Sequence, residues 1–279
     1  GLVKYGKPVG VVAAVCPSTN PAATPVNKAM MALKGGNAVV IAPSPAGYQT
    51  SARTVELMRE ELKKAGFPED LVQILPAPVS KASTQALMAG ADLAVVTGSQ
   101  DNVKRAMASG TVAIGVGAGN VPVIVDSSAD LDDAAEKITA SKIFDNSTSC
   151  SSENAIILLD DIYDAAIAAL ERQGGHRASA DEKQKILGGL WVGGKLNREV
   201  IARDMAVVAD RLGLSEAARD ARFVMVEDDR PGRDRPLSDE KLSLVVTVYR
   251  ARDFDHAKQL VRDILEVKGK GHSCGIHTA

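Results

Sequence analysis

One cysteine among small polar residues is the feature of this chain best suited to covalent chemistry. Cys150 lies in the run NSTSCSS at 146–152, between a predicted helix (131–144) and a predicted strand (155–159). A thiol in a polar connection is accessible to a small substrate, whereas an inert cysteine usually lies inside an apolar run. The segment therefore favours a nucleophilic cysteine. An unreactive free thiol remains the alternative on these residues alone.

The other two cysteines, Cys16 and Cys274, lie far from Cys150 and form no C-x-x-C pair. This spacing excludes an obvious zinc site and a disulfide framework. We therefore expect no metal site. We also expect a reducing compartment, the cytoplasm.

The composition excludes several classes of protein. The net charge is −2 and only 3% of residues are aromatic, so neither a basic surface nor a stacking platform for nucleic acid is expected. No apolar run reaches the roughly 18 residues of a membrane span, and no signal peptide opens the chain. A globular enzyme that binds neither nucleic acid nor membrane fits these limits.

The first part of the chain alternates short β-rich runs with longer helical runs. This alternation predicts parallel βαβ units in an open, Rossmann-type α/β sheet, which binds ligands at the carboxyl ends of its strands. Three turns follow such ends, at 16–21, 42–47 and 97–99. The predicted strands are 9–15, 37–42, 71–75, 93–96 and 112–115, and the predicted helices are 23–34, 50–65, 80–88 and 100–108.

The glycine cluster at 115–119 is not interpreted as a dinucleotide fingerprint. The fingerprint must open a helix, whereas this cluster continues into a strand-like run at 123–125. Thr97, Gly98 and Ser99 are a better phosphate site, because they begin a helix whose free N–H groups attract anions. Ser99 as a plain helix cap is an equally good interpretation.

The second part predicts a further α/β domain. Helices are expected at 130–144, 161–172 and 254–267, and strands at 155–159, 242–249 and 273–277. Residues 173–220 read as helical and charged, and 228–235 as an exposed loop, with the charge run 227–230 as a solvated turn. We place the domain boundary at residue 120, with domains at 1–120 and 121–279.

Several segments together resemble the CoA-acylating aldehyde dehydrogenases, a group within the aldehyde dehydrogenase superfamily. The segments are PSTNP at 17–21, GNAVV at 36–40, TG at 97–98, AIGVGAGN at 113–120, FDN…CSSE at 144–153 and EKLS at 240–243. The resemblance runs from about residue 6 to 278. It implies an NAD-binding domain at 1–120 and a catalytic domain at 121–279, and an expectation that the chain is truncated at both ends.

The resemblance also implies roles for individual residues. Cys150 matches the nucleophile that attacks the aldehyde carbonyl, and Asn20 matches the amide that stabilises the oxyanion together with the Cys150 N–H. Asn20 as a helix cap and Glu240 as a surface charge are the alternatives. The positions implied to bind the cofactor NAD are Ser18, Thr19, Ser44, Thr97, Gly98, Ser99, Gly117 and Glu240.

One departure from the superfamily pattern selects the acyl acceptor. Hydrolytic members carry a glutamate base at the position that Val116 matches, and valine cannot activate water. The resemblance then implies coenzyme A as the thiol that releases the acyl group. A hydrolytic or phosphorylating semialdehyde dehydrogenase, or a non-catalytic homologue, are the alternatives.

The resemblance further implies a homodimer or higher homo-oligomer, and fusion to or association with an alcohol dehydrogenase as an additional expectation. Small residues at 147–151 and 273–275 predict a short aldehyde, either acetaldehyde or sulfoacetaldehyde. His272 is a candidate to assist the thiol or to pair with an anionic substrate. An ordinary hydrogen-bonded histidine is the alternative.

Overall fold

The computed structural model describes residues 2–3 and 5–279. It divides into two compact units, Gly1–Gly117 and Ala118–Ala279, and each unit is described by itself. The roles that the sequence assigns to the two domains, cofactor binding and catalysis, stay predictions.

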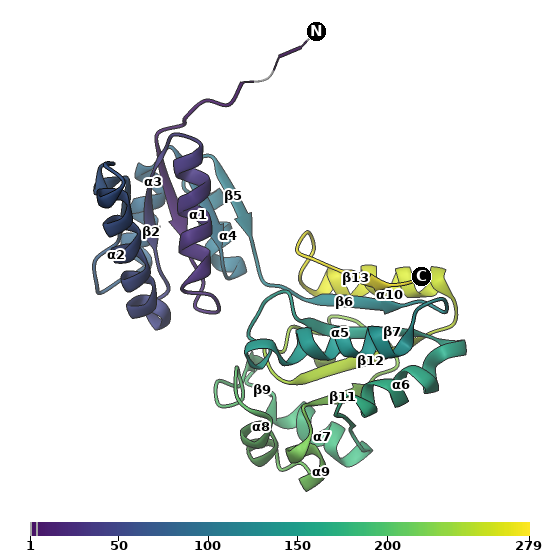
Figure 1. The fold of residues 1–279 in the computed structure, drawn as a ribbon. Helices are drawn as coiled ribbons and strands as arrows, with labels where there is room; N and C mark the ends of the chain where they lie inside the picture. The colour runs from purple at the N-terminus through teal and green to yellow at the C-terminus, as the bar shows by residue number, and fades with distance from the viewer. Residues whose placement is uncertain (1, 4) are drawn as a thin grey trace. The chain divides into compact units, whose positions relative to one another are not determined.

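The first unit is built on a five-stranded parallel sheet in the order β3-β2-β1-β4-β5 (Figure 1). Its strands are short apolar runs because both faces are covered by helices, as in other parallel sheets. They are β1 (Val11–Val15), β2 (Ala38–Ala42), β3 (Val72–Ile74), β4 (Leu93–Thr97) and β5 (Ala113–Val116).

Alternate residues of these strands face two separate cores. Val12 and Ala14 of β1 pack with Ala29 and Val55 from the helices on one face. Ala13 packs with helix residues such as Met88 on the other face. The first pair of helices is α1 (Ala23–Lys34) and α2 (Tyr48–Lys64), and the second pair is α3 (Lys81–Gly90) and α4 (Gln100–Met107).

The strand order reverses between β1 and β4, and a buried lysine joins these two strands. Lys28 Nζ donates to the carbonyls of Val15 and Val95, 2.7 Å away in both cases. Burial lowers the pKa of Lys28 to about 8. Ligands of open α/β sheets bind at such a reversal, so Lys28 fixes the two strand ends from which the predicted cofactor loops begin.

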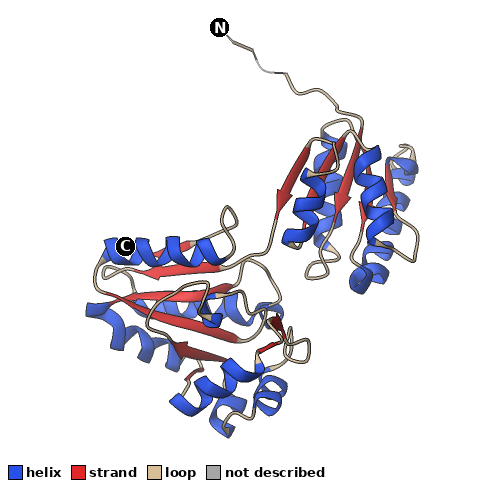
Figure 2. Ribbon diagram, turned by 180° about the vertical axis from the view of Figure 1, so that it is seen from behind, coloured by secondary structure: helices blue, strands red, loops and turns tan. Residues whose placement is uncertain are grey.

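The second unit contains a six-stranded parallel sheet in the order β13-β6-β7-β12-β11-β8. Figure 2 draws the strands in red. Every strand pair in this sheet is parallel. The strands are β6 (Val121–Val125), β7 (Glu153–Leu159), β8 (Gly175–Arg177), β11 (Phe223–Glu227), β12 (Val245–Ala251) and β13 (Gly275–His277).

Helices cover both faces of this sheet. On one face α5 (Leu131–Ile143) and α6 (Tyr163–Arg172) pack against β6, β7 and β12, together with α7 (Ala180–Gly189) and α8 (Met205–Leu212). On the other face α10 (Phe254–Val267) packs against β7 and β12. The small elements β9 (Trp191–Val192), β10 (Lys195–Leu196) and α9 (Glu216–Asp220) complete the unit.

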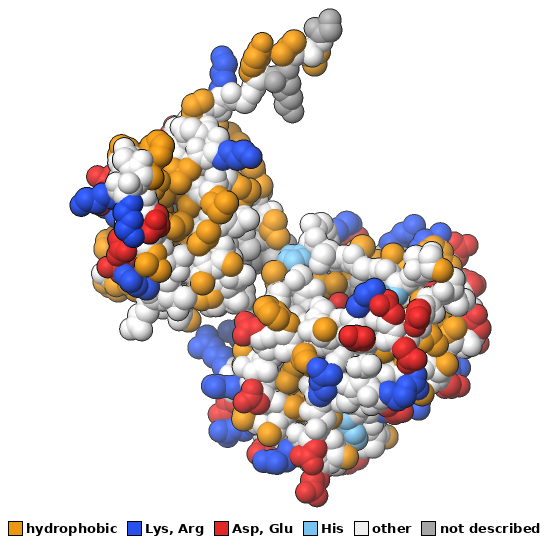
Figure 3. All heavy atoms as spheres, viewed as in Figure 1, with side chains coloured by type: hydrophobic (Ala, Val, Ile, Leu, Met, Phe, Trp, Pro, Cys, Tyr) orange, Lys and Arg blue, Asp and Glu red, His pale blue; other side chains and the backbone are white. Residues whose placement is uncertain are grey.

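The predicted α/β class with Rossmann-like parallel sheets is confirmed. The glycine cluster joins β5 directly to β6, so the rejection of a dinucleotide fingerprint there is also confirmed. Among the described residues, no helix is long and apolar enough to cross a membrane. On the face that Figure 3 shows, acidic and basic side chains of the second unit are intermixed.

Two predictions for the second unit are wrong. The region 173–220 is not only helical, because it also contains β8, β9 and β10. The charge run 227–230 is not simply a solvated turn: Glu227 ends β11 and binds Arg177, and Asp228 is buried between Lys183 and Arg235. The Asp228 side chain pairs with both Lys183 and Arg235, and the pattern of charges in the sequence does not reveal this network.

Candidate active site

The segment that carries Cys150 is a tight, strained turn between α5 and β7. Three consecutive residues, Asp145, Asn146 and Ser147, have φ values of 49°, 50° and 60°. The N–H and the hydroxyl of Thr148 both donate to the Asp145 carbonyl, at 3.0 and 2.7 Å. Aspartate and asparagine tolerate this left-handed backbone better than most residues, which is why the sequence can form the turn.

Two contacts close the turn at its base. Lys142 Nζ donates to the Glu153 carbonyl at 2.9 Å, and the Ser152 hydroxyl donates to the Ser141 carbonyl at 3.3 Å. The Lys142 side chain is fully buried, and burial lowers its pKa to about 7. An ammonium placed against a backbone carbonyl in the protein interior fixes the distance between the end of α5 and the start of β7.

Two further strained segments contact this region. Ala202 and Leu242 have φ values of 55° and 45°, and the Ala202 N–H donates to the Leu242 carbonyl at 3.0 Å. Asn146 Nδ2 donates to Asp204 Oδ1 at 2.8 Å. Within the described residues, these two and the three of the cysteine turn are the only non-glycine residues with positive φ. Strain of this kind gathers at functional sites.

The Cys150 thiol is half-buried and lies near a carboxylate. Burial, and next the charge of Glu240, raise the pKa of Cys150. Gly119 lies against both segments: a Cβ added to it would stand 2.2 Å from the Cys150 carbonyl oxygen and 3.3 Å from Glu240 Oε1. Only a glycine fits between them, so the glycine cluster has a packing role at the cysteine.

Glu240 is buried, contrary to the alternative of a surface charge. Burial raises its pKa to about 7, although Lys268 opposes this effect. The next residue, Lys241, is fully buried, and its Nζ donates to the carbonyls of Leu237, Asn154 and Asp239, at 2.7, 3.1 and 3.1 Å. The Lys241 N–H also donates to Asn154 Oδ1 at 3.0 Å. Glu240 is thus tied to the start of β7, just after Cys150.

His272 lies in the loop between α10 and β13. This loop packs on Asn120, which follows Gly119 and precedes β6. A Cβ added to Gly269 would stand 2.7 Å from the Asn120 backbone nitrogen, and the His272 N–H donates to the Gly269 carbonyl at 2.8 Å. The ring Nδ1 is 3.3 Å from the Ser273 hydroxyl, and burial lowers the pKa of His272. The lowered pKa favours the neutral imidazole.

The predicted cofactor-binding residues of the first unit lie at the carboxyl edge of its sheet. Ser18 and Thr19 follow β1, Ser44 follows β2, and Gly98 follows β4. The first two loops touch, because a Cβ on Gly47 would stand 2.7 Å from Pro21 Cβ. The Ser51 hydroxyl also donates to the Pro21 carbonyl at 2.8 Å.

Asn20 and Ser99 both make the contacts expected of helix-capping residues. Asn20 Oδ1 accepts the Ala23 N–H at 3.1 Å, and its exposed side chain makes no other hydrogen bond within the described part of the chain. The Ser99 hydroxyl accepts the Asn102 N–H at 3.3 Å at the start of α4. Gly117 packs on α4 as well, since a Cβ there would overlap the Gln100 side chain. In Asn20 the contact uses the oxygen and leaves the Nδ2 amide as a donor.

Sequence reasoning missed Lys142, Lys241 and Asn154. Lys142 carried a signal, because it follows Ala135 and Ile138 on the apolar face of α5. A lysine on such a face is either misplaced or buried for a purpose. Lys241 carried no comparable signal, since it lies in a loop.

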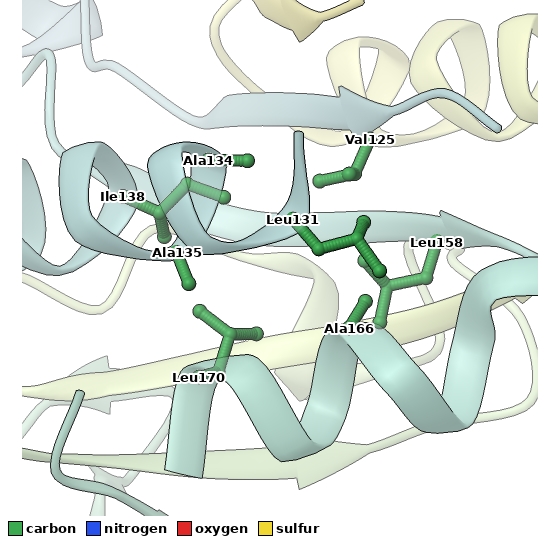
Figure 4. A pocket seen from close by; sticks show the side chains of 8 residues that line it. All are labelled: Val125, Leu131, Ala134, Ala135, Ile138, Leu158, Ala166 and Leu170. Carbon is green, nitrogen blue, oxygen red and sulfur yellow. The ribbon is translucent and has the colours of Figure 1, made fainter. Parts of the chain in front are cut away.

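The pocket in Figure 4 is a different feature. It lies between α5, α6 and the sheet, and its lining is entirely aliphatic: Val125, Leu131, Ala134, Ala135, Ile138, Leu158, Ala166 and Leu170. A small gap without polar groups is a packing defect of the core. Among the described residues, no group of His, Cys, Asp and Glu side chains could hold a metal ion.

Comparison with known proteins connects this geometry to one family. Residues 2–184 match the model of the aldehyde dehydrogenase family. The chain is 48% identical to a sulfoacetaldehyde dehydrogenase (acylating) from Cupriavidus necator, over 100% of its own length and 57% of that protein. It is 37% identical to a succinate-semialdehyde dehydrogenase (acetylating) from Clostridium kluyveri, over 99% of its own length and 61% of that protein.

Larger proteins and solved structures match as well. An aldehyde-alcohol dehydrogenase from Clostridium acetobutylicum is 32% identical, and the chain covers 32% of it. The crystal structure of an acetylating aldehyde dehydrogenase from Geobacillus thermoglucosidasius superimposes with a TM-score of 0.93 at 36% identity, covering 98% of this chain and 60% of that one. The chain thus spans about three fifths of the length of the monofunctional relatives named here.

Proposed function

The chain belongs to the aldehyde dehydrogenase family, and from this premise we propose that it is the cofactor-binding and catalytic part of a CoA-acylating aldehyde dehydrogenase. The reaction is the reversible conversion of a short aldehyde, coenzyme A and NAD⁺ into an acyl-CoA, NADH and a proton. One observation carries this proposal. A half-buried thiol lies in a strained turn that a buried lysine clamps at its base, with a buried glutamate beside it.

Cys150 is the nucleophile of the proposed reaction. Its sulfur forms a bond to the aldehyde carbon, and the carbonyl oxygen becomes an oxyanion that the Cys150 N–H and Asn20 Nδ2 stabilise. The sulfur attacks as the thiolate, so the thiol proton is released to solvent, a loss that burial and Glu240 disfavour because they raise the pKa of the thiol. The lysine clamp keeps the turn rigid, which preserves the orientation of the sulfur.

The residues of the first unit fit a dinucleotide. Hydroxyl groups of Ser18, Thr19 and Ser44 and the N-terminus of α4 at Gly98 and Ser99 gather at the carboxyl edge of the sheet, where phosphates bind in open α/β folds. Thr97 and Gly117 flank that helix start, and Glu240 would hold a ribose hydroxyl. NAD⁺, when bound there, supplies the hydride acceptor that converts the thiohemiacetal into a thioester.

Val116 supports a thiol as acyl acceptor. An aliphatic side chain at this position cannot serve as the general base that hydrolytic members carry there to activate water, so we propose that coenzyme A displaces Cys150 and restores the thiol. The relatives named acylating and acetylating support this choice. His272 is a candidate to accept the proton of the incoming thiol, because its lowered pKa favours the neutral imidazole.

The relatives also suggest the substrate. Sulfoacetaldehyde and succinate semialdehyde are both short aldehydes with a terminal acid group, and we propose sulfoacetaldehyde as the substrate here. Assembly into a homodimer or larger homo-oligomer, a cytoplasmic location, and fusion to an alcohol dehydrogenase remain proposals. The aldehyde-alcohol dehydrogenase relative supports the fusion.

Pre-steady-state NADH formation in the complete protein tests the proposal. With aldehyde and NAD⁺ but no coenzyme A, one NADH per Cys150 should form in a burst and turnover should then stop. Coenzyme A should restore it. Steady turnover without coenzyme A would indicate a hydrolytic enzyme, a requirement for phosphate would indicate a phosphorylating one, and the absence of any NADH would indicate a non-catalytic homologue.

A further inference from the structure

The segment between β10 and α8 is held against the catalytic segments at two points. Asp204 accepts the side-chain N–H of Asn146 from the cysteine turn at 2.8 Å, and the Ala202 N–H donates to the Leu242 carbonyl, two residues beyond Glu240, at 3.0 Å. Arg203 lies between these two contacts. The fold therefore fixes its backbone next to the segments that carry Cys150 and Glu240.

The backbone just before Arg203 is strained, at Ala202. Ala202 has a φ of 55°, and alanine has no side chain that could stabilise a left-handed conformation locally. Such a conformation is unfavourable for a residue with a side chain, and it persists where the surroundings enforce it. Here the strain sets the path of the chain into Arg203, immediately before the first turn of α8.

Arg203 is the cation that lies between the two contacts to the catalytic segments, and unlike Lys142, Lys241 and Lys268 it is exposed and has no partner among the described residues. Lys142 and Lys241 are buried and donate to backbone carbonyls. Lys268 pairs with Asp239 at 2.7 Å. Arg203 is exposed and forms no salt bridge within the described chain, and the neighbouring carboxylate of Asp204 accepts a hydrogen bond from Asn146.

We propose that Arg203 determines substrate specificity by binding the terminal anionic group of the aldehyde, a sulfonate or a carboxylate. The inference rests on the proposed function, since it places this anion at the Cys150 site. A guanidinium presents paired donors that match the oxygens of such groups. The proposal requires the long Arg203 side chain to extend from the α8 segment toward a substrate whose carbonyl lies at Cys150.

Kinetics of the complete protein with two aldehydes tests the assignment. Sulfoacetaldehyde and acetaldehyde have the same carbon chain and differ in the sulfonate. In Arg203→Met, kcat/KM for sulfoacetaldehyde should fall about 10- to 100-fold, mainly through KM, as expected for one lost charge-assisted contact. The value for acetaldehyde should stay unchanged. Arg203→Lys should keep part of the preference.

Arg198→Met is the matched control, because Arg198 is an exposed arginine of the same segment without a salt bridge in the described structure. It should change neither value. Equal losses for both aldehydes in Arg203→Met would overturn the assignment. A raised KM for coenzyme A alone would overturn it too, because the bound anion would then be a phosphate of that molecule.

A binding measurement separates this inference from the proposed function. Ethanesulfonate carries the anion but no carbonyl, so it should slow alkylation of Cys150 by iodoacetamide in the parent protein and fail to do so in Arg203→Met. This protection does not require turnover. If ethanesulfonate does not protect the parent, the Arg203 assignment is wrong even if the enzyme oxidises aldehydes; if it protects but no aldehyde is oxidised, the proposed function is wrong.

Discussion

At Cys150 the thiol lies near a carboxylate rather than a cation, and this has a measurable consequence. Burial and the charge of Glu240 both raise the pKa of Cys150, so Glu240→Gln removes the second cause and should lower the pKa. The rate of alkylation by iodoacetamide, followed from pH 6 to 10, should then reach its midpoint at a lower pH than in the parent.

Glu136→Gln is the control for this experiment, because Glu136 is an exposed carboxylate on α5. Its profile should match that of the parent. An unchanged midpoint in Glu240→Gln would mean that the two side chains do not interact.

The three cysteines should differ sharply in function. Cys16 is buried and burial raises its pKa to about 11, so its thiol is unreactive. Cys274 is exposed, and it lies just before β13 rather than in the last strand as the sequence predicted. Cys150→Ala should abolish NADH formation from acetaldehyde and coenzyme A. Cys16→Ala and Cys274→Ala should retain most of it. Full activity in Cys150→Ala would refute the proposed nucleophile.

Residue types predicted some of this site and not the rest. The polar surroundings of Cys150 could be predicted from the sequence, because serine and threonine residues flank it on both sides. The burial of Glu240 was not, since Asp239 and Lys241 beside it look like surface charges until the β7 segment covers them. Long-range packing of this kind leaves no local pattern.

At the level of elements, the contact between Lys142 of α5 and the Glu153 carbonyl of β7, called the lysine clamp here, can be tested by mutation. Lys142→Met removes the donor to the Glu153 carbonyl and should lower kcat roughly tenfold by loosening the cysteine turn. Stability should change little, because an aliphatic side chain replaces a costly buried charge. Lys137→Met on the same helix, where the side chain is 64% exposed, should affect neither quantity.

The pH dependence of stability checks the same residue. The pKa of Lys142 falls from 10.5 to about 7 in the folded state, so between these values the unfolded chain binds more protons and stability rises with pH. Lys142→Met should make this rise shallower in urea unfolding at pH 7 and pH 9. An equal rise in parent and variant would show that Lys142 titrates normally.

Glu182 links three elements of the second unit through one buried carboxylate. It accepts hydrogen bonds from the backbone N–H of Ser179 at the start of α7, from Ser215 at the start of α9, and from the ring of His176 in β8. Burial opposes ionisation, but these bonds lower the pKa of Glu182 to about 2. Ser215 lies 33 residues from Glu182 in the chain, so the local sequence does not reveal this contact.

Glu182→Gln should therefore reduce the free energy of unfolding by about 2 kcal/mol at pH 7. Since the folded pKa lies below the ordinary value of 4.5, this contribution is complete above pH 4.5 and is lost as pH falls toward 2. Parent and variant should converge in acid. Asp181→Asn, whose side chain is 74% exposed, should leave stability unchanged, and a constant difference down to pH 2 would contradict the assignment.

Elements with a strong periodic pattern were predictable, and short strands were not. The amphipathic helices α2 and α10 were predicted within two residues of their bounds. The three-residue strand β8 lies in a charged stretch, and it is a strand because β11 pairs with it. Pairing partners that lie about fifty residues away cannot be inferred from a local window.

At the scale of the whole molecule, each unit has hydrophobic clusters of its own among the described residues. The buried clusters of the first unit lie within residues 12–106, and those of the second lie within 123–264. Each unit also has a sheet covered on both faces and a size typical of an independent domain. The alternation of strands and helices along the chain predicted sheets covered by helices. It did not predict which residues pack together in each core, because that depends on the order of the strands in the sheet.

We expect residues 118–279 to fold when expressed without residues 1–117, because the core of this unit and the clamp around Cys150 are internal to it. Circular dichroism should show cooperative thermal unfolding, and Cys150 should react with iodoacetamide at a rate close to that in the intact chain. The variant Ile156→Ala in the same fragment is a control: removing a fully buried side chain from β7 should lower stability by about 2–5 kcal/mol. A fragment that unfolds without cooperativity, or that is insensitive to Ile156→Ala, would show that the second unit depends on the first for its core.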